Sequence, residues 1–177
     1  MRLDQFNNKS YSRGKSFFTE SLWYLVKAAF FLSALPYPGS FKRFLLRCFG
    51  AQVGAGVVIR PRVNITMPWR LKIGDYSWIG EGTTILSLDE VRIGAHVCIS
   101  QEAFLCTGSH DYRKETFDLV TGPIIIDESV WVAARAFICP GTHIRPHAVI
   151  QPASVVRGEI AGDGIYGGNP CLLIKSL

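Results

Sequence analysis

The sequence predicts an all-β solenoid, a parallel β-helix, and three observations support that class. An aliphatic residue recurs at every sixth position through most of the segment 53–156. The residue after each such anchor is often Gly, and the fourth residue after it is usually small or β-branched. A helix repeats about every 3.6 residues and a half-buried strand about every 2. A sustained period of six therefore fits a coil with flat sides, in which each side is one short strand.

The anchors form two runs separated by an interruption. They are Val53, Ile59, Ile65, Ile73, Ile79, Ile85, Ile93, Ile99 and Leu105, then Ile126, Val132, Ile138, Ile144, Ile150 and Val156. Three sides make a coil of about eighteen residues, so we expect about five coils. We expect the glycine to adopt the unusual backbone angles of a corner, and the small residue to point inward. A β-sandwich would instead alternate and break at Asn-Gly turns, and the sequence has no Asn-Gly pair.

The composition fits one solenoid domain, residues 51–177, preceded by a helical extension, residues 1–50. Of the 177 residues, 48% are hydrophobic and 12% aromatic, which excludes a disordered chain. The five cysteines are odd in number and form no Cys-x-x-Cys pair, which favours reduced cytosolic thiols. The first twenty residues are polar and lack an apolar core, so we expect no signal peptide and a cytoplasmic location.

The extension concentrates the positive charge of the chain. Residues 1–50 carry eight Lys and Arg against two acidic residues, a net charge of +6, whereas the remainder has a net charge of −1. The basic residues are not arranged as a recognisable nucleic-acid-binding module, and the solenoid is slightly acidic. We therefore expect no nucleic-acid partner.

Two helices are expected in the extension. The apolar run 22–35 has fourteen residues, too few to span a bilayer of about 30 Å, and Pro36 ends it. A second helix over 41–49 has an apolar stripe with its basic residues away from that stripe. The stripe is Phe41, Phe44, Leu45, Cys48 and Phe49, and the basic residues are Lys42, Arg43 and Arg47. Two roles stay open: the helices cap the solenoid, or residues 17–49 also contact the inner face of the cytoplasmic membrane.

The Gly-bearing repeat resembles the left-handed β-helix acyltransferases of the hexapeptide-repeat superfamily, and the resemblance supplies the handedness. Four stretches look most similar to the O-acetyltransferases assigned to colanic acid biosynthesis, relatives of the maltose, galactoside and nodulation-factor acetyltransferases. They are Ile73-Gly-Asp-Tyr-Ser-Trp-Ile-Gly-Glu-Gly, Cys98-Ile-Ser-Gln, Leu105-Cys-Thr-Gly-Ser-His-Asp-Tyr and Phe117-Asp-Leu. The likeness covers about residues 45–175. It implies an acetyl-CoA-dependent O-acetyltransferase that modifies a sugar hydroxyl in exopolysaccharide or cell-surface glycan biosynthesis, by direct transfer.

The repeat fails between Leu105 and Ile124, where a polar loop protrudes at about residues 108–123. A polar interruption of a regular solenoid indicates a binding face. His110 lies at the start of this loop, and the resemblance implies that it is the general base. Histidine titrates near neutrality, which suits removal of a proton from a hydroxyl. Asp111 or a nearby acceptor is expected to hold the imidazole tautomer that leaves Nε2 free.

The coil after the loop is expected to bind the coenzyme. The resemblance implies that the pantetheine arm lies along Trp131-Val132-Ala133-Ala134, with the Ala134 N–H as oxyanion donor. Ala133 replaces a glycine that is usual in the family. Tyr166-Gly-Gly-Asn-Pro-Cys resembles the family's turn beside the adenine, and two cations are candidate pyrophosphate partners. The predicted coenzyme residues are Trp131, Ala133, Ala134, Gly141, Ala153, Ser154, Arg157, Asn169, Pro170 and Lys175.

Three residues are predicted to contact the acceptor: Glu81, Asp89 and Tyr112. The maltose and galactoside enzymes use an asparagine near the corner that here reads Gly80-Glu81-Gly82, and its absence argues against either sugar. One face of the solenoid is too shallow to enclose both a coenzyme arm and a sugar, and relatives place both between subunits. We therefore expect a homotrimer in which His110 faces the wall 131–134 of its neighbour.

Two alternatives stay open. Trimeric carbonic anhydrases use the same β-helix and hold zinc with three histidines, and His110 and His143 occupy equivalent places that could stack in one column. The closely spaced second ligand after His110 is missing, however, and zinc needs three or four well-placed ligands, so we expect no metal. A non-catalytic scaffold that binds through its regular walls is the other alternative.

Overall fold

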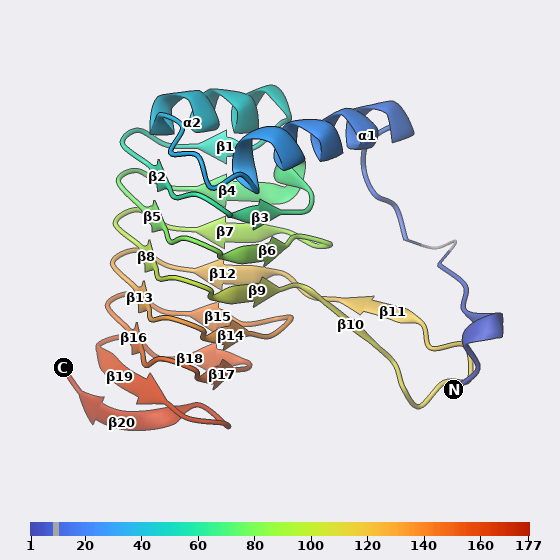
Figure 1. Cartoon of the computed structure of the whole chain (residues 1–177). Helices are drawn as coiled ribbons and strands as arrows, with labels where there is room; N and C mark the ends of the chain where they lie inside the picture. The colour runs from blue at the N-terminus through green and yellow to red at the C-terminus, as the bar shows by residue number, and fades with distance from the viewer. Residues whose placement is uncertain (9–10) are drawn as a thin grey trace.

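The computed structural model describes residues 1–8 and 11–177, and most of them form a solenoid with three walls of short parallel strands (Figure 1). Wall A contains β1 (Gln52–Val53), β4 (Leu71–Ile73), β7 (Val91–Ile93), β12 (Ile124–Ile126), β15 (His143–Ile144) and β18 (Glu159–Ile160). Wall B contains β2 (Val58–Ile59), β5 (Trp78–Ile79), β8 (Cys98–Ile99), β13 (Trp131–Val132), β16 (Val149–Ile150) and β19 (Gly164–Gly167). Wall C contains β3 (Asn64–Ile65), β6 (Thr84–Leu86), β9 (Phe104–Cys106), β14 (Phe137–Ile138) and β17 (Val155–Val156).

The aliphatic anchors stack in register through the solenoid. In wall A, the paired positions are Val53, Ile73, Ile93, Ile126, Ile144 and Ile160, and each of these side chains is buried. Wall A has six strands, so the solenoid makes about six turns, one more than the repeat count suggested. The predicted inward residues of the corners are also buried; for example, Ser77, Ala103 and Ala148 have no exposed surface. Each turn therefore contributes its apolar side chains to one continuous central core.

The corners differ from the expectation in one respect. The left-handed backbone conformation occurs at the third residue after the anchor, not at the glycine immediately after it. Nine non-glycine residues at this third place have φ between 52° and 60°: Arg62, Tyr76, His96, Glu102, Ser129, Arg135, His147, Ala153 and Asp163. The glycine after the anchor is required for space instead. A Cβ on Gly74 would lie 2.5 Å from the Ala95 nitrogen, and a Cβ on Gly94 would lie 2.7 Å from the Glu128 nitrogen, because the next coil passes directly beside them.

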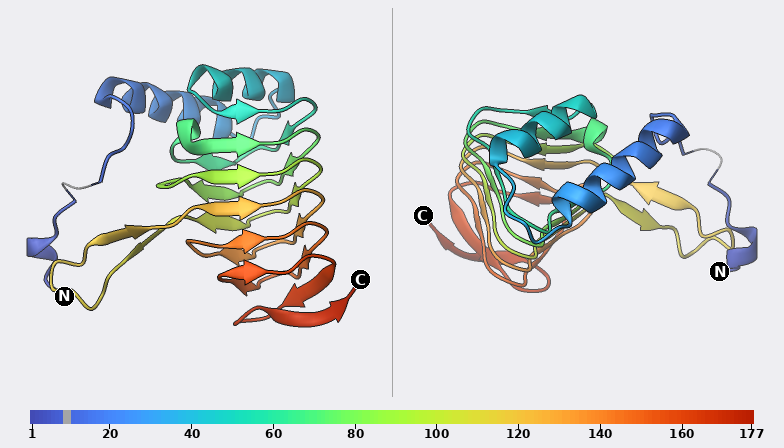
Figure 2. Two further views of the ribbon diagram at one scale, coloured as in Figure 1. Left: turned by 180° about the vertical axis from the view of Figure 1, so that it is seen from behind. Right: turned by 45° about the horizontal axis from the view of Figure 1, so that its top comes forward.

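Two helices cover the open end of the first coil, as Figure 2 shows from two sides. They are α1 (Phe17–Val26), which continues into a π-helical turn (Lys27–Phe31), and α2 (Gly39–Cys48). Trp23, Phe31 and Leu46 are buried against the solenoid core. The helices therefore form a cap, which supports the first of the two roles considered for them.

The second helix covers the solenoid with part of its apolar stripe and with its basic residues. Leu45 and Phe49 pack against the core, whereas Phe44 is exposed and the basic side chains also face the solenoid. Lys42 Nζ donates to the Arg60 carbonyl (2.9 Å), Arg43 donates to the Val57 carbonyl (2.7 Å), and Arg47 donates to the Val53 carbonyl. The first coil has no strand beyond it to bond these carbonyls, so cationic donors on the cap satisfy them. Burial lowers the pKa of the Lys42 ammonium.

The opposite end of the solenoid closes differently. The strand β20 (Leu172–Ser176) folds back antiparallel on β19 and completes wall B. Within residues 1–8 and 11–177, no helix is both long and apolar enough to cross a bilayer.

Candidate active site

The interruption of the repeat forms a two-stranded hairpin that projects from one corner (Figures 1 and 2). The strands β10 (Gly108–His110) and β11 (Leu119–Thr121) pair antiparallel, with His110 opposite Leu119. The hairpin leaves the solenoid after β9 and returns at β12, so it lies at the corner between walls C and A, here called the C–A corner. At its base, a Cβ on Gly122 would lie 2.7 Å from the Gly141 nitrogen. Gly141, a predicted coenzyme residue, therefore lies beside the hairpin.

The His110 imidazole is oriented by a backbone carbonyl. Its Nδ1 lies 2.9 Å from the Phe117 carbonyl oxygen, and the two rings stack in parallel with centroids 4.2 Å apart. A carbonyl oxygen can only accept, so this bond assigns the proton to Nδ1 and leaves the lone pair of Nε2 free. That is the tautomer a general base needs. Sequence reasoning left this acceptor open because a backbone carbonyl carries no residue-type signal.

Asp111 shapes the hairpin loop. Its Oδ1 accepts from the Arg113 N–H at 3.1 Å, and its own N–H donates to the Asp118 carbonyl at 2.9 Å. The carboxylate thus supports the turn, and Phe117 supplies the acceptor for the imidazole. Tyr112 is 72% exposed at the tip of the loop, with the Arg113 guanidinium over its ring.

A second group of predicted residues lies at the corner between walls B and C, the B–C corner. Trp131, half-exposed on wall B, donates from Nε1 to Ser100 Oγ at 2.9 Å. A hollow of about 400 Å³ contains Ala134 and Ala153, whose backbones are joined by a 2.9 Å bond from Ala153 N–H to the Ala134 carbonyl. Its other lining residues are Gln101, Glu102, Arg135 and Pro152, which the sequence reasoning missed.

The Ala134 N–H is positioned as a free donor at this corner. The neighbouring amides of Ala133 and Arg135 donate to the Ile150 and Gln101 carbonyls, whereas no acceptor in the described part of the chain bonds the Ala134 N–H. Ala133 itself is buried. Ser154, another predicted coenzyme residue, is fully buried, and its hydroxyl donates to the Gln151 carbonyl and accepts from Gly168 N–H. The Ser154 side chain is therefore part of the corner and not of the groove.

The remaining predicted coenzyme residues lie toward the β20 end of the solenoid. Outward positions along wall B align Trp131 with Val149, Ile165 and then Lys175 of β20. Three interstrand steps of about 4.8 Å separate Trp131 from Lys175, or about 14 Å. Asn169 and Pro170 form the exposed turn between β19 and β20, and Arg157 is exposed after β17.

The predicted acceptor residues are divided between corners. Glu81 lies at a B–C corner and forms an ion pair with Arg62, with 3.5 Å between nitrogen and oxygen. Asp89 lies at a C–A corner, one coil before the hairpin, where its N–H donates to Thr107 Oγ1 and its Oδ1 accepts from Glu90 N–H. Wall C separates the two corners within one chain. His110 and Asp89 therefore share one corner, while Ala134 and Glu81 share another.

The comparisons with known proteins bear on this arrangement. No family model matches the chain. It is 40% identical over 163 residues to WcaF of Escherichia coli K12, provisionally named a colanic acid biosynthesis acetyltransferase, and the match covers 92% of this chain and 90% of that protein. The chain belongs to the hexapeptide-repeat acetyltransferase family. The galactoside O-acetyltransferase of Escherichia coli K12 is 26% identical over 136 residues, covering 75% of this acetyltransferase and 67% of that one.

Solved structures share the fold. A hexapeptide-repeat acetyltransferase from Vibrio cholerae O1 biovar eltor, crystallised with acetyl coenzyme A, superposes with a TM-score of 0.83 at 24% identity, over 96% of this chain and 97% of that one. A galactoside acetyltransferase in complex with coenzyme A gives a TM-score of 0.81 at 23% identity, over 89% and 80% of the two chains. The solenoid of this acetyltransferase is thus a left-handed β-helix, as the resemblance implied.

The histidines of this acetyltransferase do not come together as the zinc alternative requires. His110 is on the hairpin, whereas His143 is on wall A, where its Nε2 lies 2.8 Å from Asp127 Oδ2. Among residues 1–8 and 11–177, no three His, Cys, Asp or Glu side chains converge as metal ligands. Within one chain, the described residues therefore supply no set of zinc ligands.

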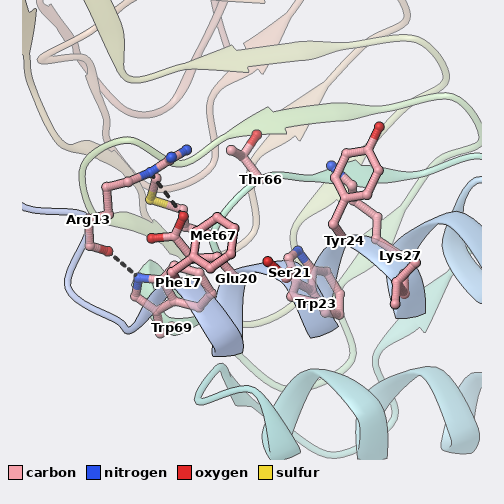
Figure 3. Close-up of a pocket in the computed structure, with 11 residues that line it drawn as sticks. Arg13, Phe17, Glu20, Ser21, Trp23, Tyr24, Lys27, Thr66, Met67 and Trp69 are labelled. Carbon is pink, nitrogen blue, oxygen red and sulfur yellow. Dashed lines mark hydrogen bonds and ion pairs between the residues drawn. The ribbon is translucent and has the colours of Figure 1, made fainter.

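A further cavity of about 540 Å³ lies beneath α1 at the first coil (Figure 3). Its lining includes Trp23, Trp69 and Met67, with an Arg13–Glu20 ion pair of 3.2 Å at one side. Trp69 Nε1 donates to the Arg13 carbonyl at 2.8 Å. None of the residues predicted for catalysis, coenzyme or acceptor lines this cavity.

Proposed function

We propose that this acetyltransferase transfers the acetyl group of acetyl-CoA to a sugar hydroxyl during synthesis of a cell-surface polysaccharide, with His110 as general base. The observation that carries the proposal is the bond from His110 Nδ1 to the Phe117 carbonyl, because it leaves Nε2 as the proton acceptor. The names of the relatives support the reaction class and the polysaccharide context. The complexes of structural neighbours with acetyl-CoA and CoA support the donor.

The transfer proceeds in two proton-balanced steps. His110 Nε2 takes the proton of the sugar hydroxyl as that oxygen attacks the thioester carbonyl carbon. The carbonyl oxygen becomes an oxyanion, which accepts a hydrogen bond from the Ala134 N–H. Collapse of this tetrahedral intermediate breaks the carbon–sulfur bond, and the imidazolium returns its proton to the CoA thiolate. The products are the acetylated sugar and free CoA, and no acyl-enzyme forms.

The donor binds along wall B in this proposal. Trp131 and the small residues Ala133, Ala134 and Ala153 flank the arm near the thioester, while Lys175 faces the pyrophosphate. Arg157 lies at a C–A corner, so in this proposal it reaches the pyrophosphate from the neighbouring copy. Asn169 and Pro170 lie beside the adenine. Gly141 has no side chain and so leaves room for the coenzyme at the base of the hairpin. The row of outward positions from Trp131 to Lys175 supports this path, since it offers an extended strip about 14 Å long.

A complete site then requires two chains, and we propose a homotrimer. Within one chain, wall C separates the hairpin of His110 from the Ala134 corner, so the hairpin serves the Ala134 corner of a neighbouring copy. Asp89 and Tyr112 would contact the acceptor from the hairpin side and Glu81 from the neighbour's side. Sedimentation equilibrium should give three times the chain mass, and a monomer would contradict the proposal.

Subunit mixing tests the shared site directly. Co-expression of a His110→Ala chain with an Ala134→Pro chain should restore activity well above that of either variant alone. If the two chains assort randomly in a trimer, about one quarter of the sites pair an intact His110 hairpin of one chain with an intact Ala134 corner of its neighbour. Absence of any restoration in verified mixed trimers would show that both residues act within the same chain.

A screen of three acceptor classes tests the chemical form of the acceptor. Acetyl-CoA consumption should be measured with free sugars, nucleotide sugars and lipid-linked oligosaccharides, each with and without anionic vesicles. Acetyl transfer to one class identifies the acceptor form. No turnover with any of them, while acetyl-CoA still binds, would favour the non-catalytic scaffold.

We further propose that the helical cap, residues 17–49, contacts the anionic inner face of the cytoplasmic membrane. Phe17, Phe18 and Leu25 of α1 are each more than 60% exposed, and the basic residues Arg13 and Lys15 are exposed just before this helix. An exposed apolar helix face beside cations suits an anionic lipid surface. Co-sedimentation with vesicles containing phosphatidylglycerol, but not with zwitterionic vesicles, and its loss at high salt would support this contact.

A further inference from the structure

The first residues of the chain lie against the tip of the catalytic hairpin, far from them in sequence. We name residues 2–8 the N-terminal strap. Its Arg2 N–H donates to the Glu115 carbonyl at 2.7 Å, and a short 3-10 helix, Leu3–Gln5, follows (Figure 1). Asn7 and Asn8 of the strap share a hollow with Asp111 and other hairpin residues. The strap therefore follows the hairpin along its outer part.

The strap also touches the proposed base. The Phe6 ring meets the His110 imidazole edge to face, with centroids 5.7 Å apart and an angle of 62° between the planes. The Phe117 ring lies parallel to the same imidazole, at 4.2 Å and 1°. The imidazole thus has one aromatic neighbour from the strap and one from the hairpin, in addition to its Nδ1 hydrogen bond.

The hairpin needs such support. Its two strands pair over three residues only, and an isolated two-stranded hairpin is marginally stable in water. A general base must be held close to its productive geometry, because a misplacement of about 1 Å can lower the rate about 10²-fold. A side chain that packs on the imidazole from a separate segment restricts both ring rotation and hairpin motion.

We propose that Phe6 is a positioning residue, which holds the His110 imidazole in the orientation for proton transfer. This inference rests on the proposed function of His110 as general base. Phe6 touches neither substrate in this proposal, and it acts through His110.

Phe6→Ala in the full-length chain should lower kcat about 10-fold to 10²-fold, with the KM for acetyl-CoA changed by less than about twofold. Phe6→Tyr, which keeps the ring, should restore most of kcat. Leu3→Ala is the matched control, since it removes an exposed apolar side chain from the same strap and should leave kcat unchanged. If Phe6→Ala lowers the thermal midpoint, Phe6→Leu provides a second measurement, because it keeps apolar bulk without the ring. Wild-type kcat in Phe6→Leu would overturn the role of the ring.

A double-mutant cycle separates positioning from general stabilisation. In a His110→Ala background, Phe6→Ala should cause no further loss of kcat, because the side chain that it positions is gone. The same fold-loss in both backgrounds would overturn the inference. If His110→Ala alone retains wild-type turnover, the proposed base is wrong and the inference fails with it. If His110→Ala is inactive while Phe6→Ala is fully active, only the inference fails.

Discussion

The His110 imidazole and the Phe117 ring are parallel to within 1°, with their centroids 4.2 Å apart, and His110 Nδ1 bonds the carbonyl of the same Phe117. One residue thus supplies both the face on which the imidazole rests and the acceptor that selects its tautomer. Phe117 itself has φ of +48°, a conformation that is uncommon for an aromatic residue. The hairpin loop therefore returns Phe117 to stack on His110, which lies seven residues earlier in the sequence.

Replacement of His110 by Ala should lower kcat by about 10² to 10⁴, because no other group would accept the hydroxyl proton. The dissociation constant of CoA, measured by calorimetry, should stay nearly unchanged, since the imidazole does not hold the coenzyme. His147→Asn is the matched control: His147 is an exposed corner residue with φ of +60°, a conformation that Asn tolerates. Turnover retained in His110→Ala would reject the assignment.

Ala134→Pro should remove the proposed oxyanion donor without disturbing the fold. Proline already occupies the equivalent second place after the anchor at Pro61, Pro146 and Pro152, so this backbone position accepts it. Loss of one oxyanion donor costs about 10² to 10³ in kcat. Ala95→Pro, at the equivalent place of another corner, is the matched control and should keep full activity. Equal activity of both variants would exclude the Ala134 N–H from the reaction.

Trp131→Ala should raise the KM for acetyl-CoA about 10-fold, which corresponds to the loss of roughly 1.4 kcal/mol of aromatic contact. Trp78 provides the control, because it lies in the same outward column of wall B, with Cys98 between it and Trp131. Both indoles are at least 50% exposed, so truncation of either should leave the core intact. Initial rates at varied acetyl-CoA distinguish the two variants, and equal KM values would argue against coenzyme binding at Trp131.

Gly74→Ala should destabilise the protein by about 2–4 kcal/mol, because the new Cβ would lie within 2.5 Å of the backbone nitrogen of Ala95. Gly158→Ala is the informative comparison. Gly158 has φ of +71° and open space around its Cβ position, so it should lose only about 1 kcal/mol from backbone strain. Urea unfolding measures both values. A Gly74 variant as stable as the Gly158 variant would contradict the close-approach explanation.

Glu90 should make stability depend on pH in the acid range. Hydrogen bonds from Arg92 and Lys72 lower the pKa of its carboxyl from 4.5 to about 2. The folded carboxyl binds its proton less readily than the unfolded one. Its contribution to stability is therefore complete above pH 4.5 and is lost as the pH falls toward 2. Glu90→Gln should lower the unfolding midpoint in urea at pH 6, and the difference from wild type should shrink between pH 4.5 and 2. A difference that is constant with pH would contradict this.

The sequence predicted the solenoid because its signal is repeated. Every turn places an aliphatic anchor at the same register, so errors at single positions do not hide the period. The interruption and His110 were identifiable for the same reason, since a break is visible only against a regular pattern. The count of turns fell short by one because the last anchor, Ile160, lies four residues after Val156 instead of six.

By itself, the sequence determined the period, the three-walled architecture, the place of the hairpin and the residue types available for acetyl transfer, because these depend on local spacing. Only the tertiary structure decided which carbonyl orients His110, which side of α2 faces the solenoid, and that Phe6 reaches the hairpin. Those outcomes depend on contacts between segments far apart in the chain. The cations of α2 turn inward because unpaired carbonyls at the open end of a solenoid need donors, a demand that appears only once the coil is built.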